Sequence, residues 1–164
     1  MKDFKNKVVA ITGAGSGMGR AYAIEFGKLG AKLALTDWNE ENLLETKQLV
    51  QELGVQEVFT KAFDVSVEEK VFKFAEEVKI ALGNTHVIIN NAGIAGQGGP
   101  FIYGDAKAFQ KVIDINLYGV IHGCRAFLPQ LVENNEGAVV NVSSVASLIG
   151  SPGGTAYNTS KFAV

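Results

Sequence analysis

Short apolar runs alternate with longer amphipathic stretches along the whole chain. The runs contain few alternating polar residues, which is typical of strands in a parallel sheet that is covered on both faces. Strict alternation of strand and helix favours right-handed βαβ units. The sequence therefore predicts an α/β protein with a doubly wound, Rossmann-like parallel sheet. The predicted strands cover residues 7–12, 32–36, 56–63, 86–90 and 138–143.

Helical periodicity fills the segments between these strands. Gly30 is suited to end the first predicted helix, and Asp105 is suited to begin the fourth as its N-cap. The helix over about 116–134 carries a wide apolar stripe, and a last helix is expected to open at Tyr157. No linker or internal repeat interrupts the pattern, so we predict one domain over residues 1–164. The other helices are expected over residues 17–29, 39–53 and 71–82.

Composition excludes several classes of function. The apolar fraction of 47% supplies a core, and a net charge of −2 provides no basic field for nucleic acid or an anionic membrane. The only cysteine, Cys124, cannot form an internal disulfide, and we interpret it as a packing residue. The first apolar run is too short for a signal peptide or a membrane span. A soluble, cytoplasmic protein without a metal site is expected.

A glycine-rich turn follows the first predicted strand. It contains Gly13, Gly17 and Gly19, and a helix is predicted to open near Gly17. Glycines let the backbone approach a ligand closely, and a helix N-terminus presents free N–H groups and a positive dipole to a diphosphate. Asp37 ends the next predicted strand, at about the spacing at which an acidic residue binds the ribose hydroxyls of NAD.

Polar clusters follow the later strands, at the same predicted edge of the sheet. Tyr157 and Lys161 are four residues apart in the last helix and therefore share one face. A nearby ammonium favours the phenolate form of tyrosine, so this pair is suited to general acid–base work. Ser144 ends the preceding strand, where its hydroxyl can hold a carbonyl oxygen. Taken alone, however, such a Tyr/Lys pair is more often an ordinary pair of surface neighbours.

Together these motifs resemble the classical short-chain dehydrogenase/reductase family. The resemblance implies hydride transfer between a nicotinamide and a substrate carbon, with Tyr157 moving a proton to or from the substrate oxygen. It also implies that Ser144 orients that oxygen, that Lys161 binds the nicotinamide ribose, and that Asn116 holds a water linked to Lys161. The matching motifs are Thr12-Gly13-x-x-x-Gly17-x-Gly19, Asn90-Asn91-Ala92-Gly93, Asn116, Ser143-Ser144 and Tyr157-x-x-x-Lys161.

The resemblance also implies which residues bind the cofactor. Asp37, together with Ser16 where NADP-dependent members often carry a basic residue, favours NAD over NADP. Trp38 is expected either to flank the adenine or to cover the sheet edge. His86 replaces a common aspartate, and for both His86 and His122 we favour packing over catalysis. The implied cofactor-binding residues are Gly13, Ser16, Gly17, Met18, Gly19, Asp37, Asp64, Val65, Asn91, Ala92, Gly93, Tyr157 and Lys161.

Three asparagines and one loop also have a purely structural interpretation. Asn116 lies on an otherwise apolar stripe and needs a partner, which local backbone also supplies. Asn90 and Asn91 are expected to pin neighbouring loops. The loop over residues 93–100 is either a flexible cover for the nicotinamide or a plain turn.

Members of this family continue well past Val164, with two more strands and a substrate-covering loop. The sequence is therefore expected to be part of a longer chain, lacking the C-terminal strands and the part that selects the substrate. We expect an NAD-dependent oxidoreductase that acts on a small alcohol or carbonyl compound and forms a homodimer or homotetramer. The alternative is a non-catalytic nucleotide-binding fragment, and a protein that truly stopped at Val164 is expected to be unstable and inactive.

Overall fold

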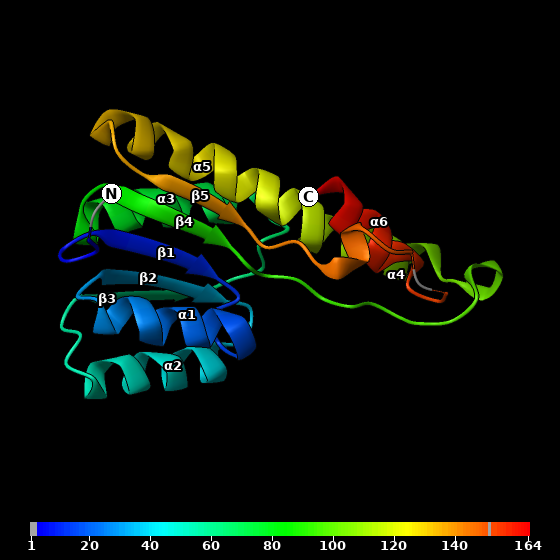
Figure 1. The fold of residues 1–164 in the computed structure, drawn as a ribbon, viewed down its shortest axis with the longest axis horizontal. Helices are drawn as coiled ribbons and strands as arrows, with labels where there is room; N and C mark the ends of the chain where they lie inside the picture. Colours follow the sequence, from blue (N-terminus) through cyan, green and yellow to red (C-terminus); the bar gives the residue numbers. More distant parts are fainter. Residues whose placement is uncertain (1–2, 151) are drawn as a thin grey trace.

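A five-stranded parallel sheet forms the centre of the protein. A computed structural model describes residues 3–150 and 152–164, and Figure 1 shows the strands between two layers of helices. The order of the strands is β3-β2-β1-β4-β5, so the chain crosses over β1 after the third strand. This confirms the predicted doubly wound, Rossmann-like sheet. The strands are β1 (Val8–Thr12), β2 (Lys32–Asp37), β3 (Val58–Ala62), β4 (Thr85–Asn90) and β5 (Ala138–Asn141).

The helices cover both faces of this sheet. Two separate apolar clusters form, one beneath α1 and α2 and the other beneath α3 and α5. Phe74 of α3 lies at the centre of the second cluster, where its ring packs against Phe63 and Phe127. The helices are α1 (Gly17–Lys28), α2 (Glu40–Glu52), α3 (Glu68–Leu82), α4 (Ala106–Ile113), α5 (Gly119–Asn134) and α6 (Thr155–Ala163). Short helical turns are η1 (Phe101–Tyr103), η2 (Asp114–Tyr118) and η3 (Val145–Ser147).

Hydrogen bonds to the backbone confirm that Gly30 ends α1 and that Asp105 begins α4. Gly30 follows α1 with φ +79°, and its N–H donates to Gly27 O, while Ala31 N–H donates to Phe26 O. This pair of bonds is the Schellman arrangement that terminates a helix. Asp105 accepts hydrogen bonds from the N–H groups of the first turn of α4 and therefore caps it.

The helix boundaries differ from the prediction in two places. The predicted break before residue 116 is wrong, because α4, η2 and α5 run on as one helical segment over residues 106–134. Its middle part, η2, is a π-helix, a form often found at functional sites. The last helix opens at Thr155 rather than at Tyr157. Tyr157 therefore lies inside the first turn of α6, with Gly154 at the cap.

A group of helices lies beyond the carboxyl ends of the strands. Figure 1 shows α4, α6 and η1 extending away from the sheet, with the long segment after β4 leading out to them. Within residues 3–150 and 152–164, no helix is long and apolar enough to span a bilayer.

Candidate active site

A pocket of about 780 Å³ opens at the carboxyl ends of β1, β2, β3 and β4. Its wall contains most of the residues that the sequence predicts as cofactor ligands. These are Gly13, Ser16, Gly17, Met18, Asp37, Asp64, Val65, Asn91, Ala92 and Gly93. Gly19, Tyr157 and Lys161 were also predicted but are not part of the wall. Trp38 lines the pocket too, and its place beside the adenine stays a prediction.

The glycine-rich loop is shaped by close approach of backbone to backbone. Gly13 has φ +66°, and a Cβ built there would lie 2.9 Å from Ala92 Cα. A Cβ on Gly19 would lie 2.0 Å from Gly13 O, so this glycine packs the loop against α1 instead of facing the pocket. Ser16, the N-cap of α1, makes no side-chain capping bond. The first N–H groups of α1 are thus left for an anion.

Asp37 is fixed at the pocket wall by two backbone donors. Gly15 N–H donates to Oδ2 at 2.8 Å, and Asn39 N–H donates to Oδ1 at 2.9 Å. Each carboxylate oxygen retains further lone pairs for a ligand hydroxyl. The arrangement suits the binding of adjacent ribose hydroxyls and opposes a phosphate in the same place.

The Asn90-Asn91 pair ties the central strands together. Asn91 Nδ2 donates to Thr12 O at 2.9 Å and to Gly13 O at 3.2 Å, which joins the end of β4 to the glycine-rich loop. Asn90 Nδ2 donates to Asn141 Oδ1 at 2.9 Å and so links β4 to β5. The expected loop-pinning contacts are therefore present.

Lys161 is almost completely buried, with 4% of its surface exposed. Its ammonium donates to Val142 O at 2.7 Å and lies 5.9 Å from the centre of the Tyr157 ring. Burial lowers the pKa of the Lys161 ammonium. Ser143 Oγ donates to Lys161 O at 2.8 Å, so the end of β5 holds α6 in place from the opposite side.

Asn116 lies in the π-helix with no exposed surface. Its Oδ1 accepts from Ile94 N–H at 2.8 Å, and its Nδ2 donates to Ile94 O at 2.9 Å and to Ser160 Oγ at 3.0 Å. A Cβ on Gly93 would lie 3.2 Å from Asn116 Oδ1 and 3.6 Å from Lys161 Nζ. Asn116, Gly93 and Lys161 therefore meet at one point, where the pocket wall reaches α6.

Ser144 lies where the chain leaves β5 for α6. Its Oγ accepts from Ala146 N–H at 3.2 Å and caps the short helical turn η3. This contact fixes the direction of the side chain, because the cap orients Oγ toward the start of the turn. Ser144, Tyr157 and Lys161 thus come from the two segments that follow the carboxyl end of β5.

Both histidines have backbone partners away from this cluster. His122 Nδ1 lies 3.0 Å from Val65 O, and His86 Nδ1 accepts from Val8 N–H at 3.2 Å. Burial, and then the charge of Lys7, lower the pKa of His86.

Four residues at or behind the pocket were not singled out from the sequence. Lys70 and Lys111 line it, while Arg20 and Thr46 contact the outer side of the glycine-rich loop. The position of Arg20 in the sequence could have pointed to its role. A cation in the first turn of a helix opposes the helix dipole and therefore needs a specific partner.

Comparison with known proteins identifies the family. Residues 7–164 match the short chain dehydrogenase family, and the chain belongs to it. This confirms the resemblance seen in the motifs, and with it the family's Rossmann-like fold.

Individual relatives agree with this assignment. The chain is 43% identical over 164 residues to SadH of Mycobacterium tuberculosis, which carries a provisional name as an oxidoreductase, and 41% identical over 162 residues to mouse epidermal retinol dehydrogenase 2. A short-chain dehydrogenase/reductase of Burkholderia phymatum in complex with NAD superposes with a TM-score of 0.95 at 39% identity, covering 99% of this chain and 58% of the other. A metagenomic short-chain oxidoreductase in complex with NADP gives a TM-score of 0.92 at 32% identity, covering 98% of this chain and 72% of that one.

The sequence is shorter than these relatives. All of the chain aligns with SadH and 99% of it with the mouse protein, but it spans only 59% and 52% of their lengths.

Proposed function

We propose that the protein is an NAD-dependent oxidoreductase that interconverts an alcohol and a carbonyl compound, with Tyr157 as general acid and base. The observation that carries the proposal is the burial of Lys161 beside Tyr157. Lys161 has 4% of its surface exposed, and its ammonium donates to Val142 O and lies 5.9 Å from the ring centre of the proposed acid. Perturbed, buried titratable groups next to a pocket favour a catalytic role.

The pocket fits a dinucleotide in its chemistry. Uncapped N–H groups at the start of α1 suit a diphosphate, and the fixed carboxylate of Asp37 suits ribose hydroxyls. The part of the wall assigned to the adenine contains Asp64 and Val65. The part that leads to α6 contains Asn91, Ala92 and Gly93. We assign NAD as the preferred cofactor because Asp37 repels a 2′-phosphate and Ser16 provides no cation to attract one.

When bound, the nicotinamide supplies the hydride acceptor or donor. Tyr157 gives its hydroxyl proton to the substrate oxygen during reduction and takes it back during oxidation. Ser144 orients that oxygen through a hydrogen bond. Lys161 binds the nicotinamide ribose beside Tyr157, with its ammonium 5.9 Å from the centre of the Tyr157 ring. Asn116 holds a water through which Lys161 exchanges protons with the solvent.

The partners in this proposal are a small alcohol or carbonyl substrate and further copies of the same chain. We propose that the protein is cytoplasmic. We also propose a homodimer or homotetramer, since α5 bears apolar side chains on more than the face that packs on the sheet. Ile121, Leu128 and Val132 of this helix are exposed.

One observation favours the second candidate, a non-catalytic nucleotide-binding fragment. Several apolar side chains near the proposed catalytic residues are exposed and do not enclose a substrate, among them Val145, Leu148 and Phe162. In this reading the pocket binds the dinucleotide without turnover.

Purified protein incubated with NAD and a panel of primary and secondary alcohols tests both candidates. Formation of NADH that depends on one of the alcohols, with lower kcat/KM for NADP, is the expected result. Binding of NADH without turnover on any alcohol or carbonyl compound would establish the non-catalytic candidate instead.

A further inference from the structure

Arg20 makes an unusual set of contacts behind the glycine-rich loop. Its Nη2 donates to Gly15 O at 2.6 Å and to Glu45 Oε2 at 2.6 Å, and its Nε donates to Thr46 Oγ1 at 3.0 Å. The guanidinium thus joins α1, the loop and α2. These contacts explain how a cation is tolerated in the first turn of α1, where the helix dipole opposes it.

Thr46 continues the same network. It is completely buried, and its hydroxyl lies 2.9 Å from Ala14 O as a donor. Two consecutive carbonyl groups of the loop, those of Ala14 and Gly15, are therefore held on the side of α2 by side chains outside the pocket wall.

Because each peptide unit is planar, a contact that fixes its carbonyl also fixes the direction of its N–H group. Within residues 3–150 and 152–164 every peptide bond is trans, so each N–H points opposite to the carbonyl of the same peptide unit. The unit containing Ala14 C=O carries Gly15 N–H, which donates to Asp37 Oδ2 at 2.8 Å. The unit containing Gly15 C=O carries Ser16 N–H, which consequently points away from Arg20, toward the pocket that Ser16 lines.

We propose that Arg20 and Thr46 are positioning residues for two different parts of the dinucleotide. Arg20 holds Gly15 C=O and so fixes Ser16 N–H as a donor to the diphosphate. Thr46 holds Ala14 C=O and so fixes Gly15 N–H on Asp37, which orients the carboxylate toward the ribose. This inference rests on the proposed dinucleotide site. One peptide unit serves the diphosphate of the dinucleotide, and the other serves the ribose.

The first test is Arg20→Met, which keeps an unbranched apolar stem and removes the guanidinium. The readout is quenching of Trp38, the single tryptophan, which lines the pocket. We expect the Kd for ADP-ribose to rise about tenfold, as for loss of one charge-assisted hydrogen bond, with the Kd for adenosine within about twofold of the parent value. Glu45→Gln is the matched control, since it removes only the exposed ion-pair partner of Arg20, and both Kd values are expected to stay unchanged.

The second test is Thr46→Val, which keeps the shape of the side chain and removes the hydroxyl. We expect the ratio of the Kd for NADP to the Kd for NAD to fall about tenfold, because the Asp37 carboxylate is no longer held toward the ribose. Arg20→Met is expected to leave this ratio unchanged, since the diphosphate is common to both dinucleotides.

The outcomes separate this inference from the function on which it rests. Parent protein that binds neither ADP-ribose nor NADH overturns the proposed function and the inference together. Parent-like ADP-ribose binding by Arg20→Met overturns the inference alone. An equal loss of ADP-ribose and adenosine binding also overturns it, since that result identifies Arg20 as a general support of the fold. Arg20→Lys, which retains the charge without the two-sided contact, is expected to recover only part of the affinity for ADP-ribose.

Discussion

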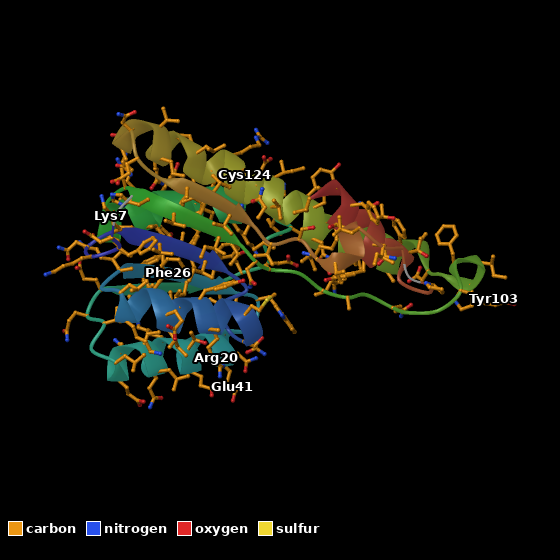
Figure 2. All side chains as sticks on the ribbon, viewed as in Figure 1. Lys7, Arg20, Phe26, Glu41, Tyr103 and Cys124 are labelled. Atoms are coloured by element: carbon orange, nitrogen blue, oxygen red, sulfur yellow. The ribbon has the colours of Figure 1, made fainter. Side chains whose placement is uncertain are left out.

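The two sides of the sheet are buried to different degrees. Every residue of β1 is buried, and β2 is buried from Leu33 onward. On the other side, β5 pairs with β4 alone among the strands of residues 3–150 and 152–164, and its Val140 is 42% exposed. The segments after β5 expose still more apolar surface, including Leu148 at 79%. Figure 2 shows the side chains of the sheet packed between layers of helices, whereas those around η1, such as Tyr103, project outward.

This difference separates the proposed binding of the dinucleotide from the proposed chemistry. The glycine-rich loop and Asp37 rest on the buried strands β1 and β2, and Asn91 at the end of β4 holds the loop. The proposed acid and its lysine rest on α6, which contacts the rest of the protein mainly through η2, η3 and α4. We therefore expect changes on the first side to act on cofactor binding and on stability, and changes on the second side to act on turnover.

The largest effect is expected from Tyr157→Phe. The substitution removes only a hydroxyl, so turnover should fall by about 10²–10⁴-fold while the Kd for NADH stays within about twofold of the parent value. Steady-state kinetics and a binding titration measure the two quantities on the same sample. Tyr103→Phe, at an exposed position outside the site, is the control. Turnover of Tyr157→Phe within a few-fold of the parent would remove this residue from the mechanism.

Stability should respond to the closed side of the sheet. Leu33→Ala, at a fully buried position of β2, is expected to lower the free energy of unfolding by about 2–5 kcal/mol through loss of packing and a residual cavity. Leu148→Ala, the matched change on the exposed side, is expected to alter it by no more than about 0.5 kcal/mol. Urea titrations of the two variants measure both. Similar losses for the two would show that Leu148 is covered in solution and that the contrast between the sides is wrong.

Cofactor preference should change with the charge of Asp37. In Asp37→Asn the amide oxygen accepts from Gly15 N–H, while the NH₂ group replaces the oxygen that accepted from Asn39 N–H. The side chain no longer repels a 2′-phosphate, so kcat/KM for NADP should rise about tenfold relative to NAD. Asp114→Asn removes a carboxylate outside the pocket wall and should leave the ratio unchanged. Parent protein that already uses NADP as well as NAD would refute the role given to Asp37.

The smallest effect is expected from His86, a residue of β4 whose ring accepts a hydrogen bond from Val8 N–H of β1. Burial and Lys7 lower its pKa in the folded state below the ordinary 6.5, so the unfolded chain binds the proton more readily. Stability from this group is therefore present above about pH 6.5 and is lost as the pH falls toward the lower folded pKa. His86→Gln should flatten this part of the curve, measured as Tm at a series of pH values. An unchanged slope would show that His86 does not contribute to it.

The sequence predicted the sheet well because its signals are local. Each strand is a short apolar run, and the motifs at the strand ends meet because parallel strands bring their carboxyl ends to one edge. The glycine-rich loop, Asp37 and the Asn91 contacts all followed from this rule. The ends of α1 and α4 were also predictable, since Gly30 and Asp105 act on backbone groups within one turn of themselves.

The parts that could not be predicted depend on contacts between distant segments. The π-helix at Asn116 forms where Ile94 and Ser160 meet the amide, and neither lies near it in the sequence. The continuity of α4 with α5 has the same origin. Arg20 and Thr46 meet only because α2 packs beside α1, so their joint hold on the loop has no local pattern.

The strand order has a consequence for how the protein is made. β1 lies between β2 and β4, but β4 follows it only after β2 and β3 and the three helices between them. At synthesis rates of about 5–20 residues per second, one edge of the apolar strand β1 stays open for several seconds after β2 has emerged. An open apolar edge invites pairing with another nascent chain. The central position that pairs β1 on both edges in the folded protein thus leaves one of these edges open while the chain is being synthesised.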